Sequence, residues 1–74
     1  MLTETRNVVD YIVVCVNEFA RRYGLSRQEA SQYLRRHNGI QFLRDFYDVE
    51  HTLSFDEAVE DLTTVCRRNG GTLA

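Results

Sequence analysis

The stretch NVVDYIVVCVNEFARRY, residues 7–23, is the most apolar run of the chain and decides its fold. Its β-branched residues favour a strand, but the run is much longer than a typical strand and has an ordinary length for a helix. Two adjacent apolar stripes follow helical spacing, Val8–Ile12–Cys15–Phe19 and Val9–Val13–Val16–Ala20. A helix that is apolar over most of its circumference has to be covered by other elements. The run therefore predicts the central helix of a small bundle.

Length and composition place the chain among small globular proteins. It has 74 residues, of which 43% are hydrophobic and 27% charged, so we expect one folded domain and little disorder. No apolar run approaches the ~20 residues that cross a bilayer. The first residues, MLTETRNVVDY, lack the basic region and cleavage site of a secretory signal. We expect a cytoplasmic protein without a membrane segment.

The rest of the chain repeats two kinds of signal, one for the start of a helix and one for its end. Ser26 with Glu29 and Ser54 with Glu57 have the spacing of capping boxes, which begin helices. Helix ends are predicted at three glycine-containing sites, namely Gly24, Asn38–Gly39 and Asn69–Gly70–Gly71. Proline is absent, and no segment alternates with a period of two, which argues against a sheet.

Together these signals predict an all-α fold with a single compact four-helix domain over residues 1–74. The helices are expected at about 6–23, 27–37, 40–50 and 55–68, the first capped by Thr3 or Thr5. Residues 1–5 and 70–74 are expected to be frayed.

The two cysteines, Cys15 and Cys66, lie on the apolar stripes of the first and last predicted helices. They are too few and too far apart for a metal knuckle or a redox Cys-x-x-Cys motif. The preferred interpretation is two buried, reduced thiols that pack as small hydrophobic groups. A disulfide between the two helices is the alternative if the protein is exported.

Charge is distributed unevenly, although the net charge is only −2. Six arginines and one acid lie between Arg21 and Arg44, whereas seven acids and no base lie between Asp45 and Asp61. All nine basic residues are arginine. One interpretation is a two-faced surface for charged partners. The other is that the second and fourth helices neutralise each other or that both faces are merely solvated.

Signatures of catalysis are weak. Asp48 and His51 are three apart and lie near Ser54, so they share a helix face on which they could bind a metal or act as a histidine base oriented by a carboxylate. A catalytic zinc needs three protein ligands, however, and His37 is the only other histidine. We interpret Asp48, His51 and Ser54 as a structural polar cluster, and we expect no enzyme activity, metal or cofactor.

Nucleic-acid binding is the alternative function. Residues 27–50 superficially resemble a helix-turn-helix, but the second of these helices is apolar and acidic, which phosphate would repel. If nucleic acid is bound, the helix that carries Arg27, Arg35 and Arg36 has to bind it.

The preferred hypothesis is a non-enzymatic protein–protein interaction module. It rests on the divided charge and on more aromatic residues than four short helices bury. Its partner is expected to be another protein or a second copy of the chain, most simply in a homo-oligomer with two-fold symmetry. The candidate interaction residues are Arg27, Arg35, Arg36, Tyr33, Phe42 and Tyr47.

Several short motifs also resemble a family of short bacterial proteins described only as a domain of unknown function. The resemblance covers about residues 8–62 and is carried by Gly24-Leu25-Ser26 with Glu29, Asn38-Gly39-Ile40 followed by Leu43, and Tyr47-Asp48 with His51-Thr52. It implies no activity, cofactor or catalytic residue. Such proteins are often encoded near larger proteins with ADP-ribosyltransferase-like domains, which implies a small partner or an antitoxin-like module.

Overall fold

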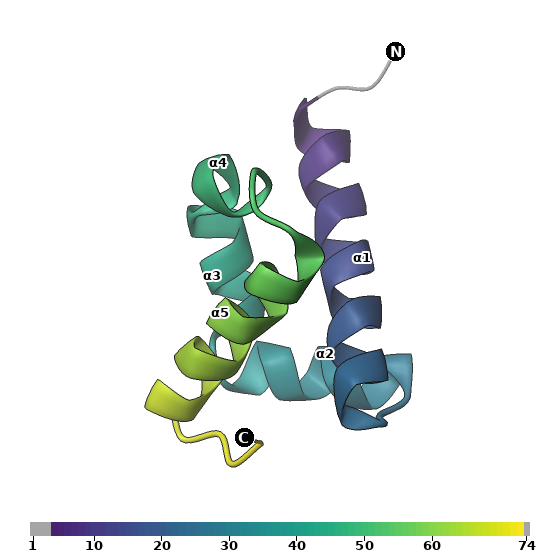
Figure 1. Cartoon of the computed structure of the whole chain (residues 1–74), viewed down its shortest axis with the longest axis vertical. Coiled ribbons are helices and arrows are strands. Elements are labelled where there is room, and N and C mark those ends of the chain that lie inside the picture. The colour runs from purple at the N-terminus through teal and green to yellow at the C-terminus, as the bar shows by residue number, and fades with distance from the viewer. Residues whose placement is uncertain (1–3, 74) are drawn as a thin grey trace.

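A computed structural model describes residues 4–73, and the regular structure in this range is entirely helical (Figure 1). Its helices are α1 (Glu4–Tyr23), α2 (Arg27–Arg36), α3 (Gly39–Asp45), α4 (Tyr47–Glu50) and α5 (Phe55–Arg68). The long α1 forms one side, α2 crosses its lower end, and α5 runs obliquely between α1 and α3 (Figure 1). The all-α prediction is confirmed. None of the helices in the described range is long and apolar enough to span a membrane.

The central helix, α1, ends where the sequence predicts. Gly24 follows Tyr23 with φ +65°, and the Leu25 N–H donates to the Ala20 carbonyl at 2.9 Å, which closes the last turn. Its start differs from the prediction, because the helix already includes Glu4 and Thr5. Thr5, one of the two predicted caps, therefore lies within the helix, and Thr3 lies outside the described residues.

Both predicted capping boxes are present. The Glu29 N–H donates to Ser26 Oγ at 3.0 Å, and the Ser26 N–H donates to Glu29 Oε1 at 2.8 Å. Ser54 and Glu57 exchange the same two bonds, at 3.1 Å each. These local bonds satisfy N–H groups that a helix start leaves without partners, so α2 and α5 begin where expected.

The junction between α2 and α3 is tighter than the predicted Asn-Gly stop. Asn38 takes the left-handed conformation (φ 71°), and Gly39 is already the first residue of α3. Gly39 is buried, and a Cβ on it would lie 2.8 Å from Leu34 Cδ2 and 3.2 Å from Cys66 Sγ. Glycine is needed here because α3 approaches its neighbours closely.

The prediction of a single helix at 40–50 is wrong, because the segment divides at Phe46 into α3 and α4. The Phe46 backbone turns to φ −115° and ψ 23°, and its carbonyl accepts from the N–H groups of Val49 and Glu50, which starts α4. The turn packs the Tyr47 ring edge-on against Tyr11, with centroids 5.5 Å apart, and leaves Phe46 53% exposed. No glycine or proline marks the break, which therefore depends on tertiary packing.

The core lies where α1, α2, α3 and α5 meet. Its largest fully buried side chains are Phe19, Leu34, Leu43 and Leu62. Cys15 and Cys66 are also buried, and both are free thiols, as the preferred interpretation predicts.

The last residues that the structure describes lie against α2. Gly70 has φ +90°, and the Gly71 N–H donates to the Cys66 carbonyl at 2.8 Å. Leu73 packs against the core, and its N–H donates to the Tyr33 hydroxyl at 3.1 Å. The structure thus places Leu73 against the core, at the end where fraying was expected, and Ala74 lies outside the described range.

Candidate functional site

A groove of about 260 Å³ lies between α1, α2 and α3. Its apolar side chains come from α1 and from the start of α3, and its polar ones come mainly from one face of α2. The lining consists of Ile12, Val13, Val16, Arg27, Ser31, Arg35, Ile40 and Arg44. We call this site the arginine groove, because three arginines border an aliphatic floor.

The helix periodicity explains how the sequence builds this groove. Arg27, Ser31 and Arg35 follow one another at spacings of four, so they occupy a single face of α2. Ile40 and Arg44 have the same spacing on α3. The tight junction at Gly39 brings α3 close to α2, and this proximity places the two faces around the same groove.

The three arginines of the groove have no acidic partner within the described residues. Arg22 of α1 instead takes the nearby acids of α5, with Nη1 3.0 Å from Glu60 Oε2 and Nη2 3.8 Å from Asp56 Oδ1. The interpretation that the acids of the last helix neutralise the arginines of α2 is therefore wrong. The positive charge of Arg27, Arg35 and Arg44 remains available to a partner.

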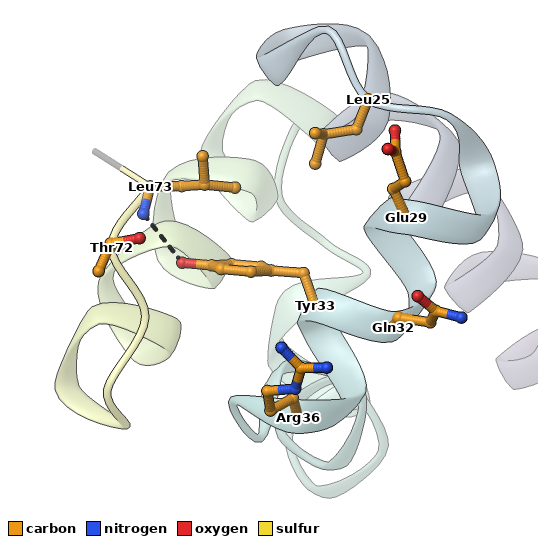
Figure 2. A pocket seen from close by; sticks show the side chains of 7 residues that line it. All are labelled: Leu25, Glu29, Gln32, Tyr33, Arg36, Thr72 and Leu73. Carbon is orange, nitrogen blue, oxygen red and sulfur yellow. Dashed lines mark hydrogen bonds between the residues drawn. The ribbon is translucent and has the colours of Figure 1, made fainter.

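A second pocket, of about 290 Å³, lies between α2 and the end of the chain. Figure 2 shows the Tyr33 ring extending from α2 toward Thr72 and Leu73, with Arg36 further along the same helix. Leu25, Glu29 and Gln32 complete the lining. Glu29 is already engaged in the capping box, and the Tyr33 hydroxyl accepts from Leu73, so these groups hold the local fold together.

The structure separates the six predicted interaction residues. Arg27 and Arg35 border the arginine groove, whereas Tyr33 and Arg36 line the second pocket. The remaining two line neither. Phe42 packs against the core, with its ring centroid 5.3 Å from that of Phe46, and Tyr47 lies between Tyr11 and His51.

The predicted cluster of Asp48, His51 and Ser54 does not form one site. His51 Nδ1 donates to the Tyr47 carbonyl at 2.6 Å, and its ring stacks on that of Tyr47. Ser54 caps α5, and Asp48 is exposed. Among the described residues no three His, Cys, Asp or Glu side chains lie close enough to hold a metal ion.

The chain carries a buried acid that sequence reasoning missed. Glu50 is only 4% exposed, and within the described range its Oε1 and the hydroxyl of Tyr11 make no hydrogen bond. Burial, together with a hydrogen bond to Asp61 and the charge of that residue, raises the pKa of Glu50 to about 7. Only the turn at Phe46 directs Glu50 inward, so no local sequence signal marks it.

The thiols of Cys15 and Cys66 are buried, as Glu50 is. Desolvation raises the pKa of Cys15 and that of Cys66 to about 11, so both thiols are protonated at neutral pH. Desolvation, and then the neighbouring Cys15, also raises the pKa of Tyr11. These groups are poor nucleophiles, and the arginine groove is the place where the chain offers accessible charge beside apolar surface.

Comparison with known proteins places the chain in a family. A model for the family described as "Protein of unknown function (DUF3791)" matches residues 10–69. No curated protein and no solved structure matches the chain. The matched segment runs from α1 to the end of α5 and includes the whole arginine groove. The chain therefore belongs to this DUF3791 family of proteins of unknown function.

Proposed function

We propose that this chain is a non-enzymatic protein–protein interaction module that binds an acidic segment of another protein in the arginine groove. The observation that carries the proposal is a set of three arginines around an aliphatic floor, none of which pairs with an acid among the residues that the structure describes. Apolar contact supplies affinity, and the arginines supply orientation and specificity. Arginine suits this role because its planar guanidinium binds a carboxylate through two parallel hydrogen bonds.

The non-enzymatic part of the proposal is supported by the state of the reactive groups. Cys15 and Cys66 are completely buried and protonated at neutral pH, and the ring nitrogen of His51 is bonded to a backbone carbonyl. None of these side chains lines either of the two pockets described above.

As part of the same proposal, the module acts in the bacterial cytoplasm as a regulatory or antitoxin-like partner of a larger protein. The resemblance of its motifs to short bacterial proteins supports this role. The groove supplies the means, since a small domain that covers an acidic segment of a larger protein can hold that segment in one conformation.

A small nucleic-acid-binding regulator is the second candidate. Arg27, Arg35 and Arg44 project from two helices around one groove, and Arg36 is exposed on the same α2, so several phosphates could be contacted at once. The aliphatic floor favours the first candidate, because Ile12, Val13 and Val16 offer nothing to a phosphate backbone.

Affinity purification from the native host tests the proposal. The variant Arg27→Glu/Arg35→Glu is compared with Arg67→Glu/Arg68→Glu, which reverses two exposed arginines at the end of α5, away from the groove. We expect the groove variant to recover at least about tenfold less partner protein, equivalent to ~1.4 kcal/mol, and the control to recover it normally.

Three other results would contradict the first candidate. Equal recovery by both variants would remove the groove from the interface. Recovery that vanishes after nuclease treatment would favour the nucleic-acid regulator. In that case retention on duplex DNA should fall with salt by a slope of about 0.9 per phosphate contact, and the groove variant should flatten that slope. An enzymatic activity that survives the groove variant would contradict the non-enzymatic assignment.

A further inference from the structure

The aliphatic floor of the arginine groove continues along α1 beyond the groove itself. Val9, Val13 and Val16 follow spacings of four and three, so they lie on one face of the helix. Val9 is 48% exposed and Val13 is 44% exposed, whereas Val16 is buried at the base. A partner therefore meets a continuous apolar surface of about two helical turns, bordered by charge at one end.

The backbone N–H and C=O groups of a bound partner need hydrogen bonds on this surface. An extended peptide binds well when a sheet edge pairs with its N–H and C=O groups. The described residues contain no strand, and the floor consists of Ile12, Val13, Val16 and Ile40 side chains, which cannot form hydrogen bonds. An extended peptide would lose water from its backbone groups there without gaining new partners. A helix satisfies those groups internally.

We therefore propose that the occupant of the arginine groove is an amphipathic α-helix of the partner, with acidic residues along the edges of its apolar face. This inference rests on the proposed function and specifies its partner. The ridges of such a helix fit the groove between packed helices, which is a recurrent mode of peptide recognition.

The positions of the arginines define the acidic pattern of that helix. Arg27 and Arg35 are eight residues apart on α2, which is about 12 Å along the helix axis. Two carboxylates about two turns apart match this separation when the partner helix runs along α2 and therefore crosses the apolar surface of α1 (Figure 1). Arg44 extends the positive border from α3, so a third carboxylate belongs on the other edge of the apolar face.

A designed peptide serves as the probe. It has about 18 residues, with leucines at positions i, i+4, i+7 and i+11, glutamates on both sides of them and alanines elsewhere. The matched control peptide has the same composition and charge, but two central alanines are D-alanine, which interrupts a right-handed helix. Each peptide is titrated into the isotope-labelled full chain at low salt, and backbone amide shifts are followed by NMR.

We expect the helical peptide to shift amides in α1, α2 and α3 around the groove and to bind at least about tenfold more tightly than the control peptide. Val13→Ser should weaken this binding. Val14→Ser is the matched protein control, because Val14 is similarly exposed (37%) but lies outside the groove lining. It should leave the binding unchanged.

The other outcomes separate this inference from the proposed function. Equal binding of the two peptides, or no shift at millimolar peptide, would overturn the helical partner. The proposed function would then still stand if Arg27→Glu/Arg35→Glu loses the native partner. The helical partner and the proposed function would both be contradicted if the peptide and the native partner each bind Arg27→Glu/Arg35→Glu as well as they bind the natural chain.

Discussion

At the scale of single residues, Glu50 is the group whose environment departs most from that of an ordinary surface acid. It is one of the seven acids between Asp45 and Asp61, yet α4 directs it between α1 and α5 beside Tyr11 and Asp61. A buried carboxyl without full hydrogen bonding favours its neutral form. The fold therefore gains stability while Glu50 holds its proton.

This environment makes the stability depend on pH. The pKa of Glu50 is about 7 in the folded chain against 4.5 for the ordinary group, so below pH 4.5 both states bind the proton and the full contribution is present. As the pH rises to 7 the unfolded chain ionises first, and up to about 3 kcal/mol is lost before the curve levels off. Glu50→Gln should remove most of this dependence.

Urea denaturation followed by far-UV circular dichroism at pH 5 and pH 8 measures the effect. Asp48→Asn, a change at an exposed acid of the same short helix, is the control and should keep the pH dependence of the natural chain. The same pH dependence in Glu50→Gln would show that Glu50 is not the responsible group.

At the scale of elements, the sequence predicted best what local bonds decide. The starts of α2 and α5 follow from Ser26 and Ser54, because a capping box needs only residues three apart. The break at Phe46 could not be predicted in this way, since it depends on the contact of Tyr47 with Tyr11, far away in the sequence.

The candidate site was predictable to the same degree. Arg27 and Arg35 were identified because they form the polar face of a predictable helix. Arg44 and Ile40 were missed as site residues, because their proximity to α2 depends on the left-handed turn at Asn38 and on the absence of a side chain at Gly39. Long-range packing of this kind leaves no periodic signal in the chain.

The capping boxes predict matched losses of stability. Ser26→Ala and Ser54→Ala should each lower the free energy of unfolding by about 1 kcal/mol, because each leaves a first-turn N–H without its acceptor. Ser31→Ala is the control within α2, where serine caps nothing and alanine is the better helix former. Chemical denaturation measures all three, and an equal loss in Ser31→Ala would exclude capping as the cause.

At the scale of the whole molecule, this very small domain exposes apolar side chains away from the arginine groove. The arginine groove lies between α1, α2 and α3, whereas Phe46, Val49 and Phe55 form exposed apolar positions around α4 and the start of α5. Their exposed fractions are 53%, 59% and 42%, which is high for side chains of this kind. The molecule thus has a second surface suited to association.

We expect this second surface to form a two-fold homodimer in the micromolar range. Phe46→Ser/Val49→Ser should shift sedimentation equilibrium toward the monomer with little loss of stability, because both side chains are already exposed. Val9→Ser, which changes an exposed valine on α1 (48%), is the control. A natural chain that sediments as a pure monomer throughout this range would exclude the dimer.

The two buried thiols also allow the opening motions of the chain to be measured. A thiol reagent modifies Cys15 or Cys66 only when the surrounding helices part, so the modification rate counts opening events. Cys66 lies against Gly39 at the centre of the bundle, whereas Cys15 senses the charge of Glu50 on α4. Mass spectrometry of the two cysteines over time thus reports whether the surroundings of Cys15 open more often than those of Cys66.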